Sequence, residues 1–335
     1  MSLKTPTCRA TSCSLRRRGA TERPTEGIVA ERDFLTLLDF ERAELDEILA
    51  LAERLKGDLR AGRSAAPLRG RVLGLVFHKP SLRTRLSFEV GMRQLGGDAL
   101  YITDAEVGFG KRESIEDIGR VLSRFLDGIM IRTFAQGEVA RLAAAASVPV
   151  INGLTDWVHP CQVLCDLFTL REQGLELDGL KIAYVGDGNN LANSWMHAAL
   201  AFALDLRLAC PAGYDPDLAS FARVGGGGRG RVRLFRDARE AVDGAQVVYT
   251  DTWTSMGQEA EAARRRAVFP PLQVNERLLG AAAPGALVMH CLPAHRGEEI
   301  TDEVIDGPRS IVYDQAENRL HGQKGILLHC LGARG

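Results

Sequence analysis

The sequence has no apolar run long enough for a membrane span. Its longest candidate, residues 142–151, contains Pro149 and falls short of the ~20 residues that a spanning helix requires. The formal net charge is −1, so bulk attraction to nucleic acid or to a membrane is not expected. The seven cysteines form no CxxC pair and no Cys/His spacing typical of structural zinc, so we expect no metal site. Scattered thiols favour a reducing compartment and predict a cytoplasmic protein.

The first 31 residues also lack the apolar core of a secretory signal. They are basic, with Arg16–Arg18 and no acidic residue before Glu22. This composition predicts a disordered extension or a start codon placed too early. An Arg/Ser-rich, acid-poor start is also typical of organellar targeting, which is the alternative interpretation.

From residue 32 the chain alternates between strand-like and helix-like segments. The predicted strands are 71–77, 99–102, 128–132, 148–152, 180–185, 206–210, 232–235, 245–250, 286–292 and 310–313. The predicted helices are 41–56, 86–97, 114–126, 137–146, 160–173, 190–204 and 237–243. The alternation predicts an α/β protein with two doubly wound parallel-sheet lobes and an active-site cleft between them. Residues 225–228 read as a glycine-rich surface loop because they lack the GK[ST] of a phosphate loop.

Polar residues follow these strands, at the sheet edge where open α/β sheets bind ligands. The most informative cluster is Ser81–Arg85 (SLRTR), between a buried strand and a helix. Unpaired N–H groups and the positive end of the helix dipole favour an anion there, and arginine offers paired donors for phosphate oxygens. An ordinary serine or threonine cap with solvated arginines would explain one such residue. Four within five positions favour a phosphate site.

The order of these clusters resembles the aspartate/ornithine carbamoyltransferase superfamily. Ser81–Arg85 and His159-Pro160-Cys161-Gln162 match motifs of the whole superfamily, while Asp251–Gly257 (DTWTSMG) and His290–Pro293 (HCLP) resemble the ornithine branch. The resemblance extends over residues 32–333. It implies a carbamoyl phosphate-binding domain at 32–155, joined by a C-terminal helix at 316–333, and an ornithine-binding domain at 156–315.

The resemblance implies that carbamoyl phosphate and L-ornithine give L-citrulline and phosphate through a tetrahedral intermediate, without a metal or organic cofactor. The reaction would serve arginine biosynthesis or run in the reverse, catabolic direction. The resemblance assigns catalytic roles to Arg132, His159, Cys291 and Asp251. The implied carbamoyl phosphate-binding residues are Ser81, Leu82, Arg83, Thr84, Arg132, His159, Gln162, Cys291, Leu292 and Arg319. The implied ornithine-binding residues are Asn190, Asp251, Ser255 and Met256. Cys291, Asp251 and the leaving phosphate remain alternatives for the group that accepts the amine proton.

The resemblance also implies a homotrimer, or a multiple of one, with shared active sites. In the family a loop before Glu113-Ser114 reaches the neighbouring subunit's site, but this chain has Gly108 where many relatives carry glutamine or histidine. Lys111 and Arg112 are candidate substitutes. Arg85 is left out of the site because Glu89, one helical turn on, can pair with it.

Three other functions are consistent with parts of the sequence. Gly186-Asp187-Gly188 after a strand suggests a nucleotide-dependent oxidoreductase, but Leu191 occupies the third glycine position of the fingerprint. A non-catalytic phosphate-binding module would not need an amino-acid clamp beside Cys291. Among carbamoyltransferases, putrescine and N-acylornithine are alternative acceptors, whereas two carboxylates of aspartate would require further cations.

Overall fold

The structure is a computed structural model, and it describes residues 32–63, 65–108, 112–217 and 230–332. The predicted N-terminal extension and the predicted glycine-rich loop at 225–228 lie outside these ranges, as does Lys111. Within them, no helix is long and apolar enough to cross a membrane.

The first lobe is built on a four-stranded parallel sheet in the order β2-β1-β3-β4. Its strands are β1 (Val72–Phe77), β2 (Asp98–Thr103), β3 (Gly128–Arg132) and β4 (Val150–Leu154). Its helices are α2 (Leu82–Gln94), α3 (Asp104–Val107), α4 (Ile115–Leu122) and α5 (Gln136–Ala145). Strands β3 and β4 are buried along their whole length, as expected for parallel strands covered on both faces.

The second lobe contains a five-stranded parallel sheet in the order β7-β6-β5-β8-β9. Its strands are β5 (Lys181–Val185), β6 (Asp205–Ala209), β7 (Arg231–Phe235), β8 (Val247–Thr250) and β9 (Leu287–His290). Its helices are α7 (Asn190–Phe202), α9 (Ala238–Val242), α10 (Ala262–Val268), α11 (Glu276–Leu279) and α12 (Asp302–Ile305). Short 3-10 turns are η1 (Leu37–Asp39), η2 (Glu259–Glu261) and η3 (Pro270–Leu272). The predicted two-lobed α/β architecture is confirmed.

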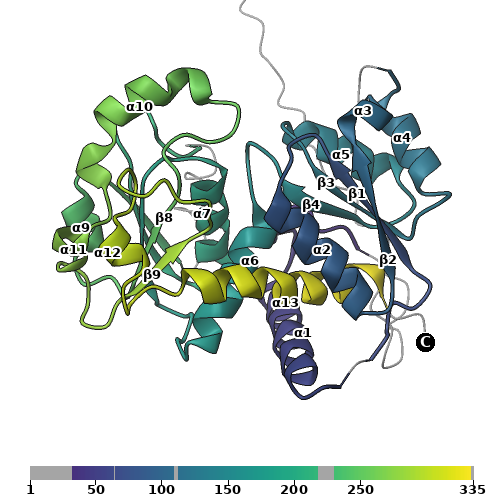
Figure 1. Cartoon of the computed structure of the whole chain (residues 1–335), viewed down its shortest axis with the longest axis horizontal. Coiled ribbons are helices and arrows are strands. Elements are labelled where there is room, and N and C mark those ends of the chain that lie inside the picture. The colour runs from purple at the N-terminus through teal and green to yellow at the C-terminus, as the bar shows by residue number, and fades with distance from the viewer. Residues whose placement is uncertain (1–31, 64, 109–111, 218–229, 333–335) are drawn as a thin grey trace, which may run out of the picture.

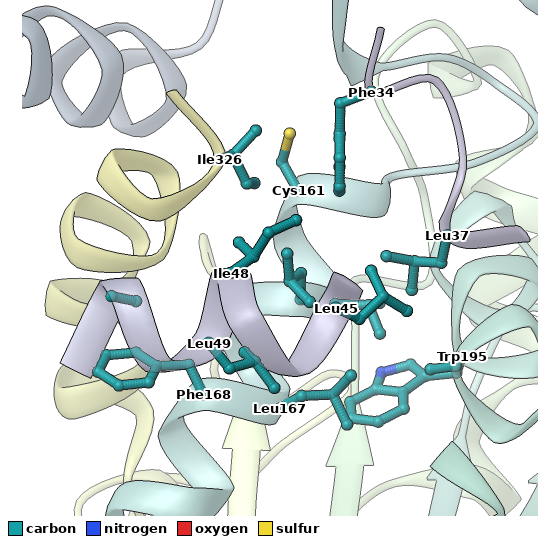
Figure 2. Packing of buried hydrophobic residues seen from close by; sticks show 14 of the residues in the cluster. Phe34, Leu37, Leu45, Ile48, Leu49, Cys161, Leu167, Phe168, Trp195 and Ile326 are labelled. Carbon is teal, nitrogen blue, oxygen red and sulfur yellow. The ribbon is translucent and has the colours of Figure 1, made fainter. Parts of the chain in front are cut away.

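Three helices join the lobes: α1 (Arg42–Arg60), α6 (Pro160–Glu172) and α13 (Val312–Leu331). In Figure 1, α13 runs from the second lobe back beneath the first, beside α6 and α1. The apolar stripe of α1, including Leu45, Ile48 and Leu49, packs against α6 and α13 in one buried core (Figure 2). Truncating a buried leucine typically costs about 2–5 kcal/mol of folding stability. The shared core therefore stabilises the helices at the base of the cleft.

The carboxyl ends of the strands meet along one edge of each sheet. In the first lobe Phe77 at the end of β1 pairs in register with Arg132 at the end of β3. In the second lobe Thr250 of β8 lies between Val185 of β5 and His290 of β9. The polar segments that follow these strands are therefore held at the same level.

Two sequence predictions require correction. The predicted strand 310–313 is wrong: only Ser310 forms an isolated bridge, to Val288, and α13 begins at Val312. A β-branched run next to a sheet edge resembles a strand, but here it leads into a helix. The helix predicted from residue 86 begins at Leu82, because Ser81 is its N-cap and accepts a hydrogen bond from the Thr84 N–H.

Candidate active site

A cavity of about 990 Å³ lies between the lobes at the strand ends. This volume is within the usual range for small-molecule sites. Every site residue predicted from the sequence lines it: Ser81, Leu82, Arg83, Thr84, Arg132, His159, Gln162, Asn190, Asp251, Ser255, Met256, Cys291, Leu292 and Arg319. The cavity therefore brings together residues from both halves of the chain.

The first-lobe side of the cavity is lined by three guanidinium groups, of which Arg132 and Arg319 are buried and Arg83 is half-buried. Arg132 Nη1 lies 3.4 Å from Thr84 Oγ1, and Arg319 Nη2 donates to the same hydroxyl at 3.1 Å. Arg83, in the first turn of α2, donates to the Leu292 carbonyl at 2.7 Å. None of these three arginines has an ion pair with a carboxylate of the described residues. Buried positive charge without an anionic partner is unfavourable, so this cluster is suited to an anionic ligand.

Arg132 is the most confined member of this cluster. It is 7% exposed, and its Nε has no hydrogen-bond partner. Burial lowers its pKa to about 9, and the neighbouring Arg319 and Arg83 act in the same direction. The guanidinium is still protonated at neutral pH, and a phosphate group would relieve both the unpaired donor and the repulsion.

His159 precedes α6, where Pro160 occupies the first helical position. Its backbone N–H donates to Ser194 Oγ at 2.7 Å, which ties it to α7. Burial lowers the pKa of the imidazole well below its usual value, and Arg319 and Arg132 lower it further. A neutral imidazole has one N–H, so His159 is able to donate a hydrogen bond to an oxygen in the cavity without being an imidazolium.

Gln162 lies in the first turn of α6 and is 1% exposed. Its Oε1 accepts from Arg319 Nη1 at 2.5 Å, and its Nε2 donates to Asp166 at 2.8 Å. The amide therefore links the arginine cluster to a buried carboxylate behind it.

The second-lobe side is centred on Asp251, immediately after β8. Its carboxylate accepts from Cys291 Sγ at 2.9 Å and from Asn189 Nδ2 at 2.9 Å. Burial raises the pKa of Cys291 well above its usual value, and Asp251 raises it further. This geometry favours the protonated thiol over the thiolate that the sequence interpretation allowed as a proton acceptor.

Asn189 was missed by the sequence interpretation. It caps α7, with its Oδ1 accepting from the Leu191 and Ala192 N–H groups, and its Nδ2 orients Asp251. The signal was present, since an asparagine that follows a strand and a glycine turn is a typical N-cap. Asn190 lines the cavity beside it, but its Nδ2 donates to the Thr155 carbonyl at 2.6 Å.

Ser255 and Met256 lie in the irregular segment after β8, at the cavity rim. Met256 is 46% exposed, and the Ser255 N–H donates to Gln258 Oε1 at 3.3 Å. Arg265 anchors this segment by donating to the Trp253 carbonyl at 2.7 Å and to Asp187 at 2.8 Å. The rim is thus held at its base while its tip is open to solvent.

Gly108 and Arg85 lie outside the cavity. Gly108 ends α3 in the left-handed region, with φ +58°, a conformation that suits glycine. Arg85 Nε donates to Glu89 at 3.2 Å, which confirms the predicted pairing.

Two groups of described residues bring three potential metal-ligand atoms within 4.8 Å of one another. In the first, His290 Nδ1 accepts from the Leu292 N–H, and Cys291 is bonded to Asp251. In the second, His295 Nδ1 contacts Thr252 Oγ1 and Glu299 Oε1 accepts from the His295 N–H. The ligand atoms of the first group are thus engaged with protein partners, as are His295 and one oxygen of Glu299 in the second group.

Two parallel-sheet lobes with an arginine-lined cavity at their strand ends define an α/β enzyme that binds an anionic substrate between its lobes. Residues 32–172 match the family model "Aspartate/ornithine carbamoyltransferase, carbamoyl-P binding domain". Residues 178–330 match "Aspartate/ornithine carbamoyltransferase, Asp/Orn binding domain". The chain belongs to the aspartate/ornithine carbamoyltransferase family.

Individual relatives resemble almost the whole chain. The ornithine carbamoyltransferase of Symbiobacterium thermophilum is 56% identical over 299 residues, which is 88% of this chain and 96% of the relative. The anabolic ornithine carbamoyltransferase of Pseudomonas aeruginosa is 52% identical over 88% of this chain and 96% of its own. The solved structure of the Pyrococcus furiosus ornithine carbamoyltransferase has a TM-score of 0.87 at 47% identity, covering 92% of this chain and 99% of that one.

Proposed function

We propose that this protein transfers the carbamoyl group of carbamoyl phosphate to the δ-amine of L-ornithine, giving L-citrulline and phosphate. The observation that carries the proposal is one cavity in which unpaired buried arginines face the Asp251–Cys291 pair. The family membership and the relatives' names support this choice of reaction.

In this proposal the first lobe, residues 32–155 with the C-terminal helix, holds carbamoyl phosphate. Ser81, Arg83, Thr84 and the Leu82 N–H bind the phosphate at the start of α2, where backbone donors and the helix dipole favour an anion. Arg132 spans the phosphate and the carbonyl oxygen. His159 donates to that oxygen and stabilises the negative charge that develops on it. Gln162, Arg319 and the Leu292 carbonyl orient the carbamoyl group.

The second lobe, residues 156–315, holds ornithine. Asp251 binds the α-ammonium group, Asn190 the α-carboxylate, and Ser255 with the Met256 backbone completes the clamp. Cys291 orients the neutral δ-amine. The amine nitrogen attacks the carbonyl carbon, and the carbon–oxygen bond to phosphate breaks as the tetrahedral intermediate collapses. Because the Cys291 thiol is protonated, the amine proton passes to Asp251 or to the departing phosphate.

The proposal extends to the assembly and setting of the protein. Five large apolar side chains of the first lobe are exposed on or beside α2, β2 and α4: Leu82, Leu86, Leu100, Val121 and Phe125. They support a homotrimer, or a multiple of one, in which apolar surface is covered by a neighbouring copy. The described cysteines are all free, which supports a reducing cytoplasm. We also propose the synthetic direction, as in arginine biosynthesis. A monomer in light scattering would contradict the proposed assembly.

A citrulline assay with purified protein tests the reaction. Carbamoyl phosphate would be combined in turn with ornithine, putrescine, N-acetylornithine and aspartate, and each carbamoylated product measured. Ornithine is expected to give the highest kcat/KM, since Asp251 and Asn190 offer partners for a free α-ammonium and α-carboxylate. Turnover of putrescine or N-acetylornithine without citrulline formation from ornithine would overturn the assignment.

A further inference from the structure

Asp166 is a fully buried carboxylate on α6, one turn beyond Gln162 and behind the cavity wall. It accepts hydrogen bonds from Gln162 Nε2 at 2.8 Å, Gln315 Nε2 at 2.8 Å and Tyr249 Oη at 2.9 Å. No lysine or arginine of the described residues lies within ion-pair distance of it. Neutral donors from three elements therefore hold this charge, at a cost that a hydrophobic residue would avoid.

The bond from Gln162 sets the orientation of its amide. With Nε2 directed at Asp166, Oε1 is directed at Arg319 and toward the cavity. A reversed amide would place its oxygen against a carboxylate and its NH₂ against a guanidinium, two repulsive contacts. Gln162 Oε1 is therefore the hydrogen-bond acceptor that this amide directs toward the cavity. A carbamoyl group exposes an NH₂ donor, which needs such an acceptor.

Gln315 extends the same arrangement to the other side of the cavity. Its Nε2 donates to Asp166 and to Tyr249 Oη, while its Oε1 accepts from the His290 N–H at 2.9 Å. His290 ends β9 and directly precedes Cys291. One carboxylate is therefore connected to both the wall beside the arginine cluster and the wall beside Asp251.

We propose that Asp166 is a positioning residue of the transfer reaction: as a carboxylate it turns the Gln162 carbonyl toward the carbamoyl NH₂ and, through Gln315, anchors the strand end that carries Cys291. This inference rests on the proposed function. It assigns Asp166 no contact with either substrate.

The protonation state of Asp166 provides a readout that a structural role would not give. Burial raises its pKa to about 6, against the effect of its three hydrogen bonds and of Arg319. The titratable and charged groups that face it are Tyr249 on β8, Arg319 on α13, Cys165 on its own helix and Cys291 after β9. Above about pH 6 the carboxylate accepts all three bonds. Below it, the added proton removes the negative charge and one acceptor position, which weakens the bond that orients the Gln162 amide.

The test is the pH profile of kcat/KM for carbamoyl phosphate in the wild type and in Asp166→Asn. Protonation of the ornithine δ-amine lowers the rate of every variant as the pH falls, so Asp166 is expected to add a further loss of activity in the wild type as the pH falls through about 6. His159 does not account for this limb, because its pKa lies well below the usual value. Asp166→Asn should lower kcat/KM by about 10- to 100-fold at neutral pH, as expected for loss of a charged acceptor, and should lack the limb.

A double-mutant cycle with Gln162→Ala separates positioning from general damage. If Asp166 acts through Gln162, Asp166→Asn should reduce kcat/KM much less in the Gln162→Ala background. Thr169→Val is the matched control, since Thr169 is buried on the same helix and bonds only to the Cys165 carbonyl and Asn318. It should lower thermal stability and leave the pH profile unchanged.

Tyr249→Phe keeps the test open if Asp166→Asn does not fold. It removes one donor that stabilises the carboxylate, so the acid limb should move to higher pH. An unshifted limb in Tyr249→Phe, a retained limb in Asp166→Asn, or full additivity with Gln162→Ala would each overturn the proposal while leaving citrulline formation by the wild type intact. A wild type that makes no citrulline would instead remove the proposed function.

Discussion

The two sides of the cavity are built differently. On the first-lobe side, Arg132, Arg319 and Gln162 are each less than one-tenth exposed and bond to helices that share the central core. On the second-lobe side, Ser255 and Met256 belong to an irregular segment whose tip is open to solvent. The comparison indicates that the anion site is organised before substrate arrives, whereas the amino-acid site is partly completed by a loop.

The difference also concerns charge. The first-lobe side concentrates guanidinium groups whose pKa values are lowered by burial, as at Arg132 and Arg83. On the second-lobe side the central carboxylate, Asp251, is already bonded to Asn189 and Cys291. A bound anion reduces the repulsion among the guanidinium groups on the first-lobe side. A bound cation on the second-lobe side gives Asp251 a third partner. Substitutions should therefore cost more on the first side.

Arg132→Ala should have the largest effect. It removes a buried cation from the phosphate and the carbonyl oxygen, so kcat/KM for carbamoyl phosphate should fall by about 10³-fold. The measurement is initial-rate citrulline formation. Arg85→Ala is the control, because Arg85 lies on α2 near the anion site but outside the cavity and bonds to Glu89, and it should behave as the wild type. Near-normal turnover by Arg132→Ala would remove it from the site.

His159→Gln should lower kcat by about 10²-fold with a smaller change in KM, since its hydrogen bond strengthens as charge develops on the oxygen. The low pKa of His159 means that the imidazole is already neutral across the assay range. Removing the His159 imidazole should therefore leave the shape of the pH–activity profile unchanged over the range of the assay, about pH 5.5 to 8. A lost limb in that range would show that an imidazolium contributes.

Asp251→Asn should act mainly on the second substrate. KM for ornithine should rise by about 10- to 100-fold, as expected for loss of a charged hydrogen bond, with little change in KM for carbamoyl phosphate. The same substitution should lower the pKa of Cys291, because Asp251 contributes to raising it. Alkylation of the thiol at fixed pH should then be faster than in the wild type. Equal changes in KM for both substrates would contradict the assignment of carbamoyl phosphate to one side of the cavity and ornithine to the other.

Ser255→Ala should have the smallest effect, a rise of about 2- to 10-fold in KM for ornithine, in keeping with loss of one exposed hydrogen bond. Varying each substrate at saturation of the other gives the two KM values separately. A larger effect than that of Asp251→Asn would mean that the loop, not the strand end, dominates recognition of the amino acid.

The sequence predicted the strand ends and the residues that gather there because that relation is local. A buried strand followed by polar residues indicates the ligand-binding edge of a parallel sheet, and Ser81, Arg132, His159, Asp251 and Cys291 were all found in this way. The C-terminal helix and its association with the first lobe were implied by the family resemblance rather than by a local pattern.

The connections between those residues were not predictable. Asp166 reads from sequence as a polar residue on a helix, and its role depends on Gln315, 149 positions away in the chain. The run 310–313 looked like a strand until the structure placed α13 there. Asn189 was overlooked beside Asn190 because only the fold shows which amide faces Asp251. In all three cases the structure depends on contacts between residues that are far apart in the chain.

Calorimetric titration of carbamoyl phosphate into the protein without ornithine tests the central claim most directly. If the anion site is organised independently of the amino-acid site, the wild type and Asp251→Asn should bind carbamoyl phosphate with similar affinity, and Arg132→Ala should show no measurable binding. Binding that requires ornithine, or that is lost equally in Asp251→Asn and Arg132→Ala, would contradict the account.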